Sequence, residues 1–207
     1  MIRKYGFLGS IKMLINLIRT KVFYKDARLI RFPFEIRNRR YIDLGRGLTT
    51  GVGCRLEALP LSNSGRKACI QFGNHVQIND YVHIGAIEHV YIGEESLLAS
   101  KVFITDHNHG SFDQQTTTQE LLTAPINRTL VAKPVYIGKR CWLGENVVIL
   151  AGVTLGEGCI VGAGTIVTKS FPPYSVIVGN PGRLQKRFNI QKGIWENGSE
   201  TGKSNAI

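Results

Sequence analysis

The sequence predicts an all-β solenoid, a fold in which short repeats stack around a long apolar interior. An aliphatic or aromatic residue recurs every six residues in three runs, the fifth residue of most repeats is small or medium-sized, and the second is often glycine. Neither a helix, with its period of 3.6, nor a strand, with its period of two, accounts for this spacing. A fixed longer period indicates stacked units that cannot bury their apolar sides alone. The recurring residues are Phe72, Ile78, Ile84, Ile92, Leu98, Ile104, Ile137, Leu143, Ile149, Leu155, Val161 and Val167.

Each repeat has the composition of a short strand followed by a tight corner. The first residue is expected to point into the interior, and Gly, Asn or Asp near the corner tolerates a positive φ or a close backbone approach. Two extra residues interrupt the spacing between Ile84 and Ile92, which predicts a bulge or small loop there. Residues 42–55 are expected to add an irregular first coil.

The N-terminal arm, residues 1–40, carries most of the positive charge. The chain of 207 residues has a net charge of +11, and the arm alone contributes +9, from eleven basic and two acidic residues. Residues 1–25 have apolar side chains at helical spacing with basic residues between them, which predicts a basic amphipathic helix. The stripe comprises Leu8, Ile11, Ile15, Ile18 and Val22. The arm is too charged to span a membrane. We consider two roles for it: contact with an anionic membrane face, or packing on its own solenoid or on a neighbouring subunit.

Composition also indicates the extent of the solenoid domain, a C-terminal tail and the cellular compartment. Residues 41–188 form the solenoid domain, and residues 189–207, rich in Gly, Asn, Ser and charge, are expected to be a flexible tail. Cys141 and Cys159 fall on inward positions, and no Cys-x-x-Cys pair or clear signal peptide is present. We therefore expect reduced cysteines and a cytoplasmic protein, peripheral at the inner face of the cell membrane if the arm binds lipid.

The six-residue spacing stops between Ile104 and Val135. A solenoid interrupted once by a long polar loop commonly carries function on that loop, so residues 105–134 are predicted to be extruded. The insert opens with Thr105-Asp106-His107-Asn108-His109. A histidine suits proton transfer at neutral pH, because its unperturbed pKa is about 6.5.

These residues resemble the hexapeptide-repeat acyltransferases, and most closely the O-acetyltransferases that modify lipopolysaccharide O-antigen and other surface polysaccharides. The resemblance spans residues 1–190 and rests on four segments: Arg31-Phe32-Pro33, residues 77–84, residues 99–110 and residues 134–138. The sequence is also similar to the galactoside and maltose acetyltransferases. The resemblance implies a left-handed parallel β-helix with three repeats per coil, acetyl-CoA as acyl donor, a saccharide acceptor and a homotrimer with sites between subunits.

The resemblance also implies roles for individual residues. A gapless alignment from Ile92 places the family's catalytic base on His109, and its substrate-binding asparagine on Asn79. His107 and His83 are further candidates for acceptor contacts, although His83 could equally be structural. A further acidic contact of the family falls on Ile87 and is therefore missing, which argues against the simple sugars as acceptors.

The coenzyme would lie along the later coils. The positions that match family coenzyme contacts are Trp142, Ala163, Thr168, Lys169 and Arg183. Lys169 and Arg183 would meet phosphates. In the expected reaction His109 takes the proton of a sugar hydroxyl while its oxygen attacks acetyl-CoA directly, with Asp106 as one candidate to orient the imidazole.

Of three other functions considered, the first remains open and the other two are not expected. An N-acetyltransferase of an amino or nucleotide sugar would share the fold, the coenzyme site and a histidine base. A nucleic-acid-binding module would use the arm, but the repeat body shows no aromatic and basic stacking face, so no nucleic-acid partner is expected. A metal site formed by Asp106, His107 and His109 has the wrong spacing for the family's metalloenzymes, so no metal is expected.

Overall fold

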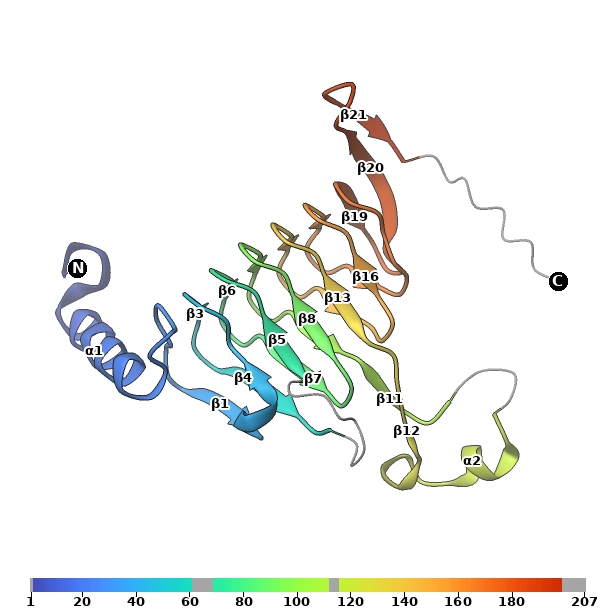
Figure 1. Ribbon diagram of the computed structural model, residues 1–207, viewed down its shortest axis with the longest axis horizontal. Coiled ribbons are helices and arrows are strands. Elements are labelled where there is room, and N and C mark those ends of the chain that lie inside the picture. The colour runs from blue at the N-terminus through green and yellow to red at the C-terminus, as the bar shows by residue number, and fades with distance from the viewer. Residues whose placement is uncertain (1, 61–68, 112–115, 199–207) are drawn as a thin grey trace.

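The computed structural model describes residues 2–60, 69–111 and 116–198, and it shows a three-faced parallel β-solenoid (Figure 1). Helix α1 (Ile2–Phe23) lies at one end and the antiparallel hairpin of β20 (Arg183–Asn189) and β21 (Ile194–Asn197) at the other. The segment containing α2 (Thr118–Leu122) projects from the side. The predicted solenoid is confirmed, and its three sheets are here named faces A, B and C.

The strands of each face stack in parallel, one per coil. Face A consists of β3 (Thr49–Thr50), β6 (Gln77–Ile78), β9 (Leu97–Leu98), β14 (Trp142–Leu143), β17 (Ile160–Val161) and β19 (Ser175–Val178). Face B consists of β1 (Phe34–Arg37), β4 (Cys54–Ala58), β7 (His83–Ala86), β10 (Phe103–Thr105), β15 (Val148–Ile149) and β18 (Ile166–Val167). Face C consists of β2 (Ile42–Asp43), β5 (Ile70–Phe72), β8 (Val90–Ile92), β13 (Val135–Ile137) and β16 (Thr154–Leu155).

The six-residue spacing becomes three vertical ladders inside the solenoid. All twelve recurring residues are buried, and those on one face stand directly above one another, as in the series Ile84, Ile104, Ile149 and Val167 on face B. Strands in a sheet lie about 4.8 Å apart, so each coil places its apolar residue in van der Waals contact with the next. Cys141 and Cys159 are buried in the same interior, and all four cysteines are free.

The corners are close-packed against the neighbouring coil. Gly45 has φ +59°, and a Cβ added there would lie 2.4 Å from the carbonyl oxygen of Gly73. Only glycine combines that conformation with so close a backbone approach. The corners define two edges used below: edge AB, where the chain passes from face A to face B, and edge BC, where it passes from face B to face C.

Helix α1 (Ile2–Phe23, with non-helical Gly6) packs with an unexpected side toward the solenoid. Asn16 and Thr20 are buried, whereas the predicted apolar stripe points to solvent, with exposed fractions from 42% for Ile11 to 79% for Leu8. The helix therefore packs on its own solenoid, as one of the two alternatives expected, but through its polar side and not through the apolar stripe. No helix in the described part of the chain is long and apolar enough to cross a membrane.

Two predicted boundaries need correction. Residues 34–37 of the predicted arm form β1, which pairs with β4, because their alternating side chains complete face B. They are followed by the 3₁₀ turn η1 (Arg39–Tyr41). Residues 189–198 of the predicted flexible tail are also structured: β20 (Arg183–Asn189) pairs with β19 and with β21 (Ile194–Asn197), and Phe188 packs edge-to-face on Trp195. The rest of that tail, residues 199–207, lies outside the described residues.

The insert leaves the solenoid at edge BC. It contains the antiparallel pair β11 (His107–His109) and β12 (Leu130–Ala132), helix α2 (Thr118–Leu122) and the 3₁₀ turn η2 (Pro125–Asn127). Residues 112–115 of the insert lie outside the described residues. The extrusion predicted for residues 105–134 thus begins directly after β10 and returns at β13 (Figure 1).

Candidate active site

Asp106 joins the two places where the six-residue spacing is interrupted. Its carboxylate is fully buried and accepts hydrogen bonds from the backbone N–H groups of Ile87, Glu88 and His89, at distances from 2.7 to 3.2 Å. The two extra residues between Ile84 and Ile92 therefore form a corner whose amides converge on one carboxylate. This contact anchors the root of the extruded loop to the coil below it.

Asp106 also fixes the orientation of His107. The Asp106 Oδ1 atom lies 2.9 Å from His107 Nδ1. Burial raises the pKa of Asp106, but the hydrogen bonds from His107 and the three amides outweigh it and hold the pKa below its usual range. The carboxylate is thus ionised at neutral pH and Nδ1 of His107 donates to it, so in the neutral imidazole Nε2 carries the lone pair.

His109 is oriented by a different group. Its Nδ1 atom lies 3.0 Å from the carbonyl oxygen of Pro125, in turn η2. A carbonyl oxygen only accepts hydrogen bonds, so Nδ1 carries a proton, and in the neutral imidazole Nε2 is again the lone-pair acceptor. The suggestion that Asp106 orients His109 is wrong, because Asp106 is turned toward His107 and the interior. No sequence signal pointed to Pro125, which lies sixteen residues away.

His107 and His109 occupy alternate positions of β11. Side chains at such positions of a strand lie on the same side, so both imidazoles project from one side of the hairpin. His107 is half-buried and close to face B, since a Cβ added at Gly85 would lie 3.7 Å from its ring and 4.0 Å from Nε2 of His83. His109 is exposed. The structure thus brings His83 and His107 together on either side of Gly85.

Both ring nitrogens of His83 have hydrogen-bond partners within the protein. Arg55 can only donate, so Nδ1 of His83 accepts from its guanidinium at 3.2 Å, and Nε2 donates to Glu57 at 2.7 Å. Burial lowers the pKa of His83, and the charge of Arg55 lowers it further against the opposing effect of Glu57. The ring also packs on Phe103. Glu57 and Arg55 were not predicted from the sequence, because their role arises only from stacking of β4 on β7.

The other predicted residues lie on different faces and edges. Asn79 and Ala163 lie on edge AB, Thr168 and Lys169 on edge BC, and Trp142 on the outside of face A, half exposed. Arg183 begins β20. Edges AB and BC border opposite sides of face B, so a single chain does not bring Asn79 beside the histidines. Ile87 is completely buried.

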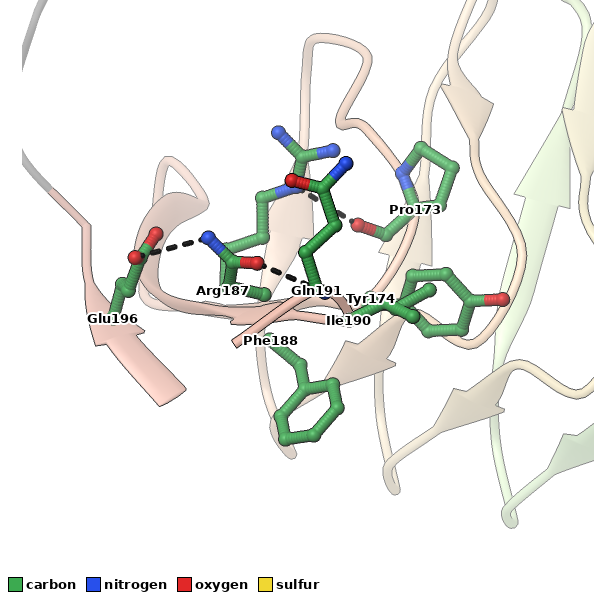
Figure 2. A pocket seen from close by; sticks show the side chains of 8 residues that line it. Pro173, Tyr174, Arg187, Phe188, Ile190, Gln191 and Glu196 are labelled. Atoms are coloured by element: carbon green, nitrogen blue, oxygen red, sulfur yellow. Dashed lines mark hydrogen bonds between the residues drawn. The ribbon is translucent and has the colours of Figure 1, made fainter. Parts of the chain in front are cut away.

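A cavity of about 330 Å³ lies away from the histidines, between the last coil and the hairpin β20–β21 (Figure 2). In it Arg187 donates from Nε to the carbonyl of Pro173 and Asn189 donates to Glu196. None of the predicted site residues lines it. In the described part of the chain, no group of three His, Cys, Asp or Glu residues is placed to hold a metal ion.

Comparison with known proteins decides the family. Residues 134–169 match the family model described as the hexapeptide repeat of succinyl-transferase. The chain is 45% identical over 194 residues to the "putative lipopolysaccharide biosynthesis O-acetyl transferase WbbJ" of Escherichia coli K12, covering 94% of this chain and 96% of that one. The chain belongs to the hexapeptide-repeat acyltransferases. Membership makes it an acyltransferase and implies the left-handed form of the β-helix.

Two solved structures have the same fold. AntD, an N-acyltransferase from Bacillus cereus solved with dTDP and 3-hydroxybutyryl-CoA, gives a TM-score of 0.63 at 19% identity, covering 81% of this chain and 83% of that one. The acetyltransferase VCA0836 from Vibrio cholerae, solved with acetyl-CoA, gives 0.55 at 24% identity, covering 73% and 74%. At these identities the likeness concerns the fold alone.

Proposed function

We propose that this acyltransferase is an acetyl-CoA-dependent O-acetyltransferase that modifies a sugar hydroxyl of a cell-surface polysaccharide, such as O-antigen or capsule, or of its precursor. The observation that carries the proposal is the orientation of His109. Its Nδ1–H is held by the Pro125 carbonyl and the residue is exposed on the loop, so Nε2 of the neutral imidazole can accept a hydroxyl proton. The full-length similarity to a protein named as a lipopolysaccharide O-acetyltransferase supports the saccharide acceptor.

In the proposed reaction His109 acts as general base. Nε2 takes the hydroxyl proton as the sugar oxygen forms a bond to the thioester carbonyl carbon, and the tetrahedral oxyanion is stabilised by a hydrogen-bond donor of the site. The carbon–sulfur bond then breaks, the sugar keeps the acetyl group, and the imidazolium returns its proton to the departing CoA thiolate. No covalent acyl-enzyme is needed, and all four cysteines are buried.

The remaining site residues keep their proposed roles with one qualification. His107 and Asn79 would hydrogen-bond the acceptor, and Trp142, Ala163, Thr168, Lys169 and Arg183 would contact the coenzyme. His83 can contact a saccharide only through its ring, because both of its nitrogens already have protein partners.

We propose that the active protein is a homotrimer. Residues assigned to one reaction lie on opposite edges of face B, so a second copy must complete each site. The outward rows of faces A and B in the later coils are apolar, as expected of surfaces covered by other copies, whereas the row of face C carries two tyrosines and a threonine. These rows are Leu97, Trp142 and Ile160 on face A, Phe103, Val148 and Ile166 on face B, and Tyr91, Tyr136 and Thr154 on face C.

We also propose a cytoplasmic enzyme that contacts the inner face of the cell membrane peripherally through residues 1–25. The concentration of positive charge in the arm and the exposure of its apolar stripe support this contact.

A second candidate function is N-acylation of an amino sugar, because the fold is similar to that of AntD, a named N-acyltransferase. The two functions differ in the bond formed. An O-acetyl ester is cleaved by neutral hydroxylamine, whereas an N-acetyl amide resists it.

The test is a thiol-release assay with acetyl-CoA and saccharide acceptors, followed by hydroxylamine treatment of the product. We expect acceptor-dependent thiol release and a hydroxylamine-labile acetyl group. A hydroxylamine-stable product would establish the N-acyl function instead. Binding of acetyl-CoA without thiol release on any saccharide would contradict the proposed acceptor class.

A further inference from the structure

Helix α1 presents a continuous apolar surface to solvent. Seven side chains fall within roughly 120° of its circumference, because successive residues turn by about 100°. Their exposed fractions lie between 42% and 79%. They are the five residues of the predicted stripe, Leu8, Ile11, Ile15, Ile18 and Val22, together with Phe7 and Leu14, and all seven are called the apolar stripe from here on. Large apolar surfaces of this kind on soluble proteins mark interaction sites.

The opposite side of the helix is polar and is bonded to the first coil. Thr20 Oγ1 accepts from the backbone N–H of Ile30 at 2.8 Å, and Asn16 Oδ1 accepts from that of Phe32 at 3.3 Å. The Arg19 guanidinium lies over the Phe32 ring, 4.0 Å from its centre. The usual arrangement, with apolar residues inward, is therefore reversed, and the helix is held with its apolar stripe facing away from the solenoid.

Charge indicates what covers the stripe. The sequence of α1 contains five basic residues and no acidic one. Exposed Lys12 flanks one margin of the stripe, and exposed Lys21 flanks the other. Pairing two copies of this surface would bring the cations together without a counter-charge. An apolar stripe bordered by cations fits an anionic phospholipid surface, where apolar side chains enter the acyl boundary and basic side chains reach the headgroups.

We propose that α1 lies in the surface of an anionic phospholipid membrane, with the apolar stripe in the lipid, and that the acceptor is a lipid-linked saccharide drawn from the same membrane. This inference rests on the proposed O-acetyltransferase function. Because α1 caps the first coil, the solenoid stands on the membrane by its N-terminal end (Figure 1). Strand β10, at the root of the histidine loop, is the third strand beyond β1 on face B, about 14 Å along the stack. A saccharide anchored in the bilayer can extend over that distance.

The first experiment measures binding to vesicles. Co-sedimentation uses phosphatidylcholine vesicles with and without phosphatidylglycerol, comparing wild type with Ile11→Glu/Ile18→Glu and a control, Ile190→Glu/Ile194→Glu, which alters two similarly exposed isoleucines at the far end. We expect binding only to anionic vesicles, weakened at least tenfold by the α1 substitutions and unchanged by the control. Equal binding by all three proteins, or no binding by wild type, would overturn the membrane contact.

The second experiment measures acetyl transfer to one saccharide in two forms, linked to its lipid in anionic vesicles and released from it. We expect Ile11→Glu/Ile18→Glu to lower kcat/KM at least tenfold on the vesicle-borne acceptor and to leave the released acceptor unaffected. Equal wild-type kcat/KM on both forms would overturn the lipid-linked acceptor. Absence of transfer to either form would refute the proposed function itself, whereas the vesicle-binding result would stand independently.

Discussion

Asp106→Ala is expected to destabilise the protein by about 3 kcal/mol. The substitution removes the acceptor of three backbone N–H groups and of His107. Hydrogen bonds to a charged group contribute about 1.5–3 kcal/mol each, and a buried donor left unpaired costs about 1–3 kcal/mol. Ile87 is a buried residue, whereas Glu88 and His89 are half-exposed residues whose amides water can reach more easily. Most of the loss of stability therefore comes from the Ile87 amide, which stays unpaired, and from the loss of hydrogen bonds to a charged acceptor.

The assay is urea denaturation at fixed protein concentration, followed by circular dichroism, with Asp43→Ala as matched control. Asp43 is exposed and accepts one backbone N–H, from Gly45, so its loss should cost about 1 kcal/mol or less. If Asp106→Ala were within about 1 kcal/mol of wild type, the carboxylate would not anchor the loop, and the account of the loop root would be wrong.

The stabilisation by Asp106 should depend on pH. The pKa of Asp106 is lower in the folded protein than its usual value of about 3.9. Its contribution to stability is thus fully present above pH 3.9 and is lost as the pH falls through the lower, folded-state pKa. The difference in stability between wild type and Asp106→Ala should be constant near neutrality and should shrink below about pH 4. A difference that persisted unchanged through that range would contradict an ionised Asp106.

Three further predictions test separate parts of the structure. Gly45→Ala should lower the free energy of unfolding, measured by urea denaturation, by at least about 2 kcal/mol more than Gly193→Ala does. Both glycines have positive φ, but of the two only Gly45 has a backbone atom where the new Cβ would lie. Equal losses of stability would contradict the corner packing. Burial raises the pKa of Cys54 to about 11, so this thiol should resist iodoacetamide at pH 8 until the protein unfolds; rapid native labelling would contradict its burial. Trp142→Ala should weaken acetyl-CoA binding about tenfold, measured by calorimetry, with little change in unfolding because the side chain is half exposed; unchanged affinity would remove it from the coenzyme site.

Features that depend on local periodicity could be predicted from the sequence. The twelve apolar residues all lie in the interior, since burying one residue per repeat is the only way a six-residue unit can stack. The interruption after Ile84 and the insert after Ile104 were also located correctly. Their connection through Asp106 was not predictable, because the carboxylate meets amides seventeen to nineteen residues earlier, and only the stacking of coils brings them together.

The side of α1 that faces the solenoid was not predicted correctly, for a different reason. Periodicity shows that a helix has an apolar side but not which side faces the protein, and here Asn16 and Thr20 form specific hydrogen bonds that decide it. The hairpin β20–β21 was missed because its polar composition resembles that of a flexible tail. Its order depends on pairing with β19 and on the contact between Phe188 and Trp195.

The central claim is that His109 is the base of the acetyl transfer, and its most direct test compares His109→Ala with His107→Ala. Thiol release from acetyl-CoA should be measured with a saccharide acceptor, alongside acetyl-CoA binding. We predict that His109→Ala lowers kcat by a factor on the order of 10²–10⁴ while acetyl-CoA binding is retained, and that His107→Ala has a smaller effect. A larger loss for His107→Ala would assign the base to the Asp106–His107 pair, and near-wild-type activity of His109→Ala would contradict the account.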